Sequence, residues 1–287
     1  MSVPIAAESV WHLGSFPVTN SLLNAWLAVA FFVLTAWFVR KNLSADKPGK
    51  FQVAVEGLLE FLLGYVDQVT HDRARSKRFF PLVATLFLFI LLSNWMGSLP
   101  GTGSIGVWRS VHGETELVPL FRPANADLNL TLAMALLSIV ASHLIGMITV
   151  GFFVHWNRFI ALGTVVRAFK KGGVNIMVGL VEAMVGVIEL FAEVAKVVSL
   201  SLRLFGNIFA GEVLITVMYS LAAYVVPLPF TFLELIVGAV QATVFSMLTL
   251  VYLTILSEKP HGEHEEDPGK REHSTLQQQS AASISHS

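Results

Sequence analysis

The chain has 287 residues, of which 54% are hydrophobic and 14% are charged, and its mean hydropathy is +0.66. Soluble domains carry about 25% charged residues, so this composition indicates a membrane protein with several crossings and excludes an ordinary soluble domain. A net charge of −1 gives no reason to expect a nucleic-acid partner, and the lack of cysteine excludes disulfides, thiolate catalysis and cysteine-based metal sites.

Five apolar stretches follow one another along the chain, and each has about the 20 residues that a helix needs to cross a bilayer. They comprise residues 22–39, 79–99, 128–154, 174–223 and 228–256. Residues 51–66 predict a further helix, which is either amphipathic and lies on the inner membrane surface or is short and packed in the loop. We therefore expect an all-α membrane protein with five membrane-inserted helices.

Basic residues gather in two of the connecting segments. Residues 40–78 and 155–173 are rich in Lys and Arg, whereas residues 1–21 contain neither. By the positive-inside rule the N-terminus lies outside and the C-terminus lies in the cytoplasm, a parity that five crossings give. We expect residues 1–21 to form an outward segment, residues 22–256 a single helical membrane domain, and the polar residues 257–287 a disordered cytoplasmic tail.

The fourth stretch is too long for a simple crossing. Residues 174–223 contain no proline, and a continuous helix of this length would extend about 75 Å, against a hydrocarbon core of about 30 Å. Such a helix must tilt steeply, break or project from the membrane. Its ionisable residues are Glu182, Glu189, Glu193, Lys196, Arg203 and Glu212. Simple lipid-facing helices do not carry such a load, so we expect a function for it.

Helical spacing sorts these polar groups around the helix. Glu189, Lys196, Arg203 and Asn207 fall on one stripe, with Ser199 at its margin. Glu212 lies on the opposite side and about 13 Å further along the axis, so Arg203 and Glu212 cannot pair on a regular helix. The group that neutralises Arg203 must therefore come from elsewhere in the chain or from another protein.

The last two stretches are expected to form a long, strongly tilted helical hairpin, residues 174–256. A single register places Glu212 level with Glu234 and Arg203 level with Gln241, because both pairs are centred on the same turn. Two carboxyls that share a low-dielectric site cannot both ionise cheaply, which suits a proton relay. Arg203 cannot lose its proton and is a fixed charge.

These residues resemble the signature of subunit a of F-type ATP synthases. The resemblance rests on SLSLRLFGNIFAGE at residues 199–212 and on four further segments in the same order, namely FPVTNSLL, PLVATLFLFILLSNWMGSLPG, PANADLNLTLAMAL and VQATVFSMLTLVYL. It covers about residues 16–257, and residues 102–121 are not distinctive. It implies a non-catalytic subunit of an enzyme of the bacterial plasma membrane. The subunit itself is expected to use no cofactor or metal.

The resemblance also implies a mechanism and a set of partners. Protons would cross through two offset half-channels beside a ring of c subunits, and peripheral-stalk b subunits would contact the inward loop. Arg203 would face the ring, drive the ring carboxylates to give up their protons and prevent a short circuit. The remaining positions divide between the outer half-channel or the arginine's surroundings (Asn207, Glu212, Glu234, Gln241), the inner exit (Glu189, Ser199) and the outer entrance (Asp127, Asn129).

Several interpretations remain open at this stage. Asp127 directly precedes the third stretch and suits both a helix N-cap and a channel position. For His143 we expect a packed, hydrogen-bonded side chain in preference to a relay, and a pair with Glu193 explains Lys196 nearly as well as the family does. Neither the coupling ion, proton or sodium, nor the number of c subunits can be read from this chain.

Two other classes of function compete with this interpretation. A proton-coupled secondary transporter would show repeated halves and a midplane pocket, and the chain has no internal repeat. A structural scaffold would use the buried charges only to bind partner helices. The chain contains no GxxxxGK[ST] phosphate-binding loop, so nucleotide chemistry is expected on partner subunits.

Overall fold

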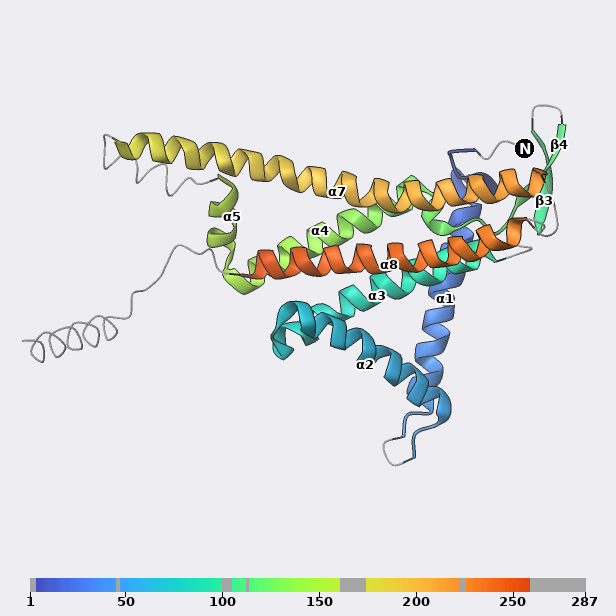
Figure 1. The fold of residues 1–287 in the computed structure, drawn as a ribbon, viewed down its shortest axis with the longest axis horizontal. Helices are drawn as coiled ribbons and strands as arrows, with labels where there is room; N and C mark the ends of the chain where they lie inside the picture. The colour runs from blue at the N-terminus through green and yellow to red at the C-terminus, as the bar shows by residue number, and fades with distance from the viewer. Residues whose placement is uncertain are drawn as a thin grey trace, which may run out of the picture. The chain divides into compact units, whose positions relative to one another are not determined.

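The computed structural model describes residues 4–44, 47–99, 105–111, 114–160, 174–221 and 226–258. Most of this part of the chain is helical (Figure 1). The helices are α1 (Asn20–Lys41), α2 (Lys50–Thr70), α3 (Arg73–Ser98), the 3-10 turn η2 (Ala124–Ala126), α4 (Leu128–Val150), α5 (Phe152–Ile160), α7 (Val174–Leu221) and α8 (Pro227–Ser257). The expected disordered tail lies almost entirely outside the described residues.

Four of the described helices are long and apolar enough to cross a membrane, namely α1, α3, α4 and α8. Large apolar side chains on α1 point outward instead of into a core, as Phe31 (53% exposed) and Trp37 (60% exposed) show. Such an exposed apolar belt suits lipid and not water. The prediction of a helical membrane protein is confirmed, whereas the fifth crossing, α7, stays a prediction.

Polar side chains fix where several helices begin. Thr19 accepts a hydrogen bond from the backbone N–H of Leu22 at the start of α1, and Asp72 does the same for Ala74 at the start of α3. Asp127 accepts from the N–H of Asn129 at 2.9 Å, so the predicted N-cap of α4 is confirmed. Each cap satisfies an N–H group that the first helical turn leaves without a partner.

The third apolar stretch is divided, contrary to the single run of residues 128–154. The helix α4 ends at Val150 and is followed by Gly151, whose φ of +100° suits glycine, and α5 begins at Phe152. Apolar composition continued past this point and hid the break.

Two short hairpins accompany the helices and were not predicted. Strands β1 (Ser9–Leu13) and β2 (Phe16–Thr19) pair antiparallel ahead of α1, and β3 (Gly106–Val111) pairs with β4 (Glu114–Pro119) between α3 and η2. Their strands have only four to six residues, too few to give a clear alternating pattern.

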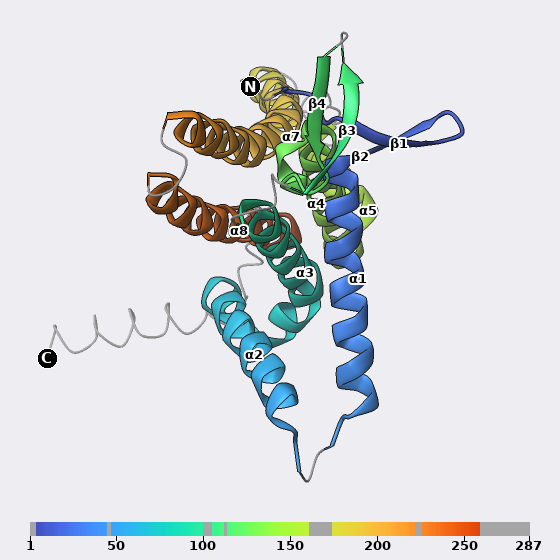
Figure 2. The same cartoon turned by 90° about the vertical axis from the view of Figure 1, so that its right-hand side faces the viewer.

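The helices α7 and α8 run side by side, and α8 also packs closely on α3 (Figure 1). The helix α4 contacts both α7 and α8. The central core between them is apolar, and its most buried members are Ile90, Ala126, Ala135, Leu200, Leu204, Ile208, Ala242 and Phe245. Figure 2 shows α1 crossing the α7–α8 pair steeply, because α1 is seen side-on and runs down the picture while α7 and α8 are seen nearly end-on.

Candidate functional site

Glu234 of α8 is buried against α7. The residue is 6% exposed, and its Oε1 atom has no hydrogen-bond partner among the described residues. Its carboxylate lies directly on Gly211, where any Cβ atom would overlap it. Glycine at this position therefore allows the carboxyl of one helix to rest on the backbone of the next.

Glu212, one residue further along α7, is held by an arginine from outside the helix pair. The Nε atom of Arg122 donates to Glu212 Oε2 at 3.0 Å and lies 3.0 Å from Oε1. The arginine side chain is 2% exposed and that of Glu212 18%. The expected neighbourhood of Glu212 and Glu234 is present, because the two carboxyls act on each other electrostatically, but Glu212 also has a cation that was not foreseen.

Arg122 uses its remaining donors on the N-terminal segment. Its Nη1 atom donates to the carbonyl of Ala6 at 3.2 Å, and its Nη2 atom donates to that of Pro4 at 2.9 Å. The guanidinium also lies 5.9 Å from the ring centre of Phe209 on α7. The backbone of Arg122 is fixed as well, because its carbonyl accepts from Asn24 Nδ2 of α1 at 2.8 Å.

Arg203 differs from the other cations of this region. It lies exposed on α7, and within the described part of the chain it has neither a hydrogen bond nor an ion pair. Asn207, one turn on, is exposed too, and Gln241 of α8 is half-buried. No described hydrogen bond joins Arg203 to Gln241, and their predicted level positions on the two helices stay a prediction.

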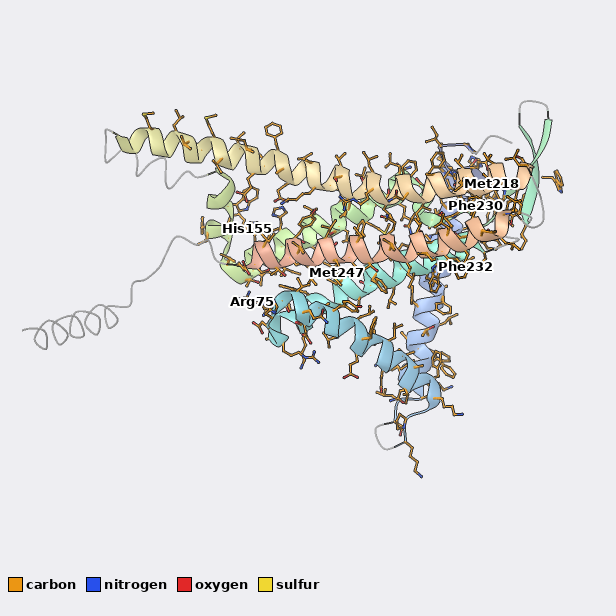
Figure 3. The ribbon with its side chains drawn as sticks, viewed as in Figure 1. Arg75, His155, Met218, Phe230, Phe232 and Met247 are labelled. Carbon is orange, nitrogen blue, oxygen red and sulfur yellow. The ribbon has the colours of Figure 1, made fainter. Side chains whose placement is uncertain are left out.

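A second polar cluster lies nearer the start of α7, where Figure 3 shows His155 at the end of the molecule opposite Met218 and Phe232. Lys196 donates to Glu193 at 2.6 Å, which confirms their local pair. His143 of α4 shares a 3.0 Å hydrogen bond with His155 of α5 and lies 3.5 Å from Glu193. The prediction that His143 is a packed, hydrogen-bonded side chain is confirmed.

The two inner-exit candidates lie on the same part of α7. Glu189 is half-buried and Ser199 is exposed. At the other end of the molecule, Asp127 caps α4 and also accepts a 3.0 Å hydrogen bond from Ser21 of α1, while Asn129 is exposed. The capping role of Asp127 thus has a direct structural basis, and the channel role stays a prediction.

Sequence reasoning gave Arg122 no role. The signal that could have found it is its position, because it is one of only two basic residues in the segment 100–127 and stands five residues before the α4 cap. The amides of Asn94 and Asn125 were missed for a different reason. They are buried and bonded to each other at 2.7 Å, but the sequence around an asparagine does not indicate a partner 31 positions away.

Ionisable side chains buried along a long helix pair are typical of the class of membrane proteins that move ions through a bilayer. The family model of the ATP synthase A chain matches residues 22–254. The chain therefore belongs to the subunit a family of F-type ATP synthases, as its resemblance predicted. Membership in this family displaces the secondary-transporter and scaffold interpretations.

Curated relatives cover nearly the whole chain. Subunit a of the Mycobacterium ulcerans ATP synthase is 32% identical over 250 residues, which is 86% of this chain and 90% of the relative. A sodium ion specific subunit a from Propionigenium modestum is 31% identical over 253 residues, covering 87% and 78%. Subunit a from Moorella thermoacetica is 29% identical over 244 residues, covering 85% and 93%.

The family assigns the general role of the protein. It is an integral membrane subunit that serves proton transport coupled to ATP synthesis, and it works with the c-subunit ring and other subunits of the synthase.

Proposed function

We propose that this subunit provides two offset proton half-channels and that Arg203 is the fixed charge between them. The observation that carries the proposal is the exposure of Arg203 without an ionic partner in the described residues, although Arg122 and Lys196 nearby both have carboxylate partners. An arginine in lipid is costly unless another group neutralises it. The mid-membrane carboxylate of a passing c subunit would be that group.

The outer half-channel would include Glu212, Glu234, Asn207 and Gln241, with Asp127 and Asn129 near its entrance. Support comes from the two neighbouring carboxyls, one of them 6% exposed. The inner half-channel would leave past Ser199 and Glu189. An offset between the two paths requires the proton to travel on the ring, and the positive field of Arg203 favours release of that proton.

The tilt of the α7–α8 pair is part of the proposal. The 22 residues of α1 extend about 33 Å, which matches a bilayer crossed directly. The 48 residues of α7 extend about 72 Å and cross α1 steeply in both views. With α1 upright, α7 would count as the fifth membrane-inserted helix and lie as a strongly tilted stator surface along the ring.

The remaining parts of the proposal concern orientation and attachment. The N-terminus would face outward and the C-terminus the cytoplasm of a bacterial plasma membrane. The helix α2 would lie along the inner surface, and the segment from α1 to α3 would contact the peripheral-stalk b subunits.

The decisive experiment replaces Arg203 in the complete synthase. We expect Arg203→Ala to abolish ATP-driven proton pumping into inverted membrane vesicles, because the ring carboxylate loses the charge that expels its proton. Arg40→Ala is a matched control, since Arg40 is an exposed cation at the end of α1 and outside the proposed path. Normal pumping by Arg203→Ala in assembled complexes would eliminate the proposal. Repeating the assay without sodium distinguishes a proton path from a sodium path.

A further inference from the structure

Three charged groups surround the carboxylate of Glu212. Arg122 approaches from the segment ahead of η2 and contacts both carboxylate oxygens, Glu234 lies on α8, and Glu8 of the N-terminal segment acts on it through space. Of these three neighbours, only Arg122 is positive. A guanidinium cannot be deprotonated in a protein, so Glu212 has a permanent counter-ion.

Glu234 has no such partner. It is nearly as buried as Arg122, and no described cation forms an ion pair with it. A buried carboxylate without a counter-ion costs far more free energy than a neutral carboxylic acid, whereas an ion-paired carboxylate is stabilised in its charged form. The two neighbouring carboxyls therefore differ in how well their charged forms are stabilised, because Arg122 pairs with Glu212 and not with Glu234.

We propose that Arg122 is a positioning residue of the outer path: it holds Glu212 as a fixed anion, so that the proton which enters and leaves is carried by Glu234. A proton from the outer water binds the Glu234 carboxylate and later leaves it for the carboxylate of a c subunit, while Glu212 keeps its charge throughout. The inference rests on the proposed function and adds a division of labour between the two carboxyls.

The geometry of Arg122 gives it a second effect on the same path. Its two terminal nitrogens bind the carbonyls of Pro4 and Ala6, so the guanidinium joins the N-terminal segment to α7 at Glu212. The side chain thus bonds to α7 and to the N-terminal segment at the same time, which holds its guanidinium in place against the Glu212 carboxylate. Lysine could keep the charge but could not make the same set of directed bonds.

The pH profile of ATP-driven pumping, normalised to the amount of assembled subunit, tests this inference. In Arg122→Gln the Glu212 carboxylate loses its counter-ion and binds a proton more tightly, so we expect half-maximal pumping to move to higher pH by about one to three units. Arg122→Lys keeps the positive charge and is expected to keep the wild-type profile. A purely structural role for Arg122 would lower the amount of assembled protein and leave the profile unmoved.

The double variant Arg122→Gln/Glu212→Gln removes one positive and one negative charge together. We expect its profile to return to that of the wild type, and we expect Glu234→Gln to reduce pumping by about tenfold or more, because a carrier of the proton has then been lost. The double variant also supplies the measurement if Arg122→Gln alone fails to assemble, since removal of both members of a buried ion pair is far better tolerated than removal of one.

Three results would overturn the inference: an unmoved profile in assembled Arg122→Gln, an assembled double variant that does not pump, or normal pumping by Glu234→Gln. None of these results depends on Arg203. A failure of the proposed function is seen instead as normal pumping by Arg203→Ala, so the two failures can be told apart.

Discussion

At the scale of single residues, the chemistry of a charged group here depends on what lies across from it and not on its own helix. Arg203 and Glu212 are nine positions apart on α7, yet one is exposed without an ionic partner in the described chain and the other is bound by Arg122. The same holds for glycine. Gly211 is required because the Glu234 carboxylate occupies the space of its missing side chain.

Because of the contact at Gly211, we predict that an alanine at this position lowers stability, opposite to its usual effect in a helix. Replacing a helical glycine by alanine normally stabilises a helix by about 1 kcal/mol, but at Gly211 the added methyl group would displace the Glu234 carboxylate at an overpacking cost of about 1–3 kcal/mol. We expect Gly211→Ala to lower the thermal stability of the purified complex and to impair pumping. The control is Gly64→Ala in α2, where an added Cβ would meet no atom within 4 Å. A melting temperature of Gly211→Ala at or above that of the wild type would contradict the geometry.

At the scale of helices, the α7–α8 pair is kept in place by neighbours that bury polar groups as well as apolar ones. Asn94 of α3 donates to the carbonyl of Gly238 on α8 at 3.3 Å and accepts from Asn125 of η2 at 2.7 Å. The two helices approach so closely here that a Cβ on Gly238 would lie 3.0 Å from the Asn94 Cβ. One amide thus connects three elements in an environment without competing water.

Removing this amide should loosen the packing of α3 on α8. We expect Asn94→Ala to reduce the free energy of unfolding by about 1–3 kcal/mol, because the buried carbonyl of Gly238 and the amide of Asn125 lose a partner. Denaturant titration of the protein in detergent measures this. Thr85→Ala is the control on the same helix, since Thr85 is exposed and bonds only to the preceding turn of α3. Equal stability of the two variants would show that the amide contact contributes nothing.

At the scale of the whole molecule, the arrangement separates two polar regions along the long helix pair. The carboxyls Glu212 and Glu234 lie near the connection between α7 and α8, whose residues 222–225 are outside the described part, and the cluster of Glu193 and His143 lies toward the start of α7. Arg203 is between them on α7. A pair of offset half-channels needs this order, with one polar region on each side of Arg203 along α7. The order is the same whether protons move inward or outward.

The absence of cysteine makes the proposed orientation directly testable. A cysteine introduced at Ser15, in the exposed turn between β1 and β2, should react with a membrane-impermeant maleimide in spheroplasts. A cysteine at Glu258, just past α8, should react only in inverted vesicles. The physical reason for this expectation is the excess of Lys and Arg in the segment between α1 and α3, which the positive-inside rule assigns to the cytoplasmic side. Labelling of both positions from one side would refute five crossings.

Sequence by itself determined the class of this protein and the placement of its charges along each helix. Apolar length predicts crossings because the bilayer has a fixed thickness, and helical periodicity separates Arg203 from Glu212 because the rise and rotation per residue are fixed. The N-cap at Asp127 and the Glu193–Lys196 pair were readable for the same reason, since the partners lie within one turn of each other.

Tertiary structure alone decided which of these charges are neutralised. Arg122 reaches Glu212 across 90 positions of sequence, and Asn94 reaches Gly238 across 144. The spacing of residues in the sequence predicts neither contact, because the partners lie on elements that only tertiary packing brings together. The short hairpins escaped prediction because their strands are too short to show an alternating pattern, and the break at Gly151 because apolar composition continues past it. Periodicity tells where a charge sits on its helix, but only the fold supplies its partner, and the partner determines whether a carboxyl is a fixed anion or a proton carrier.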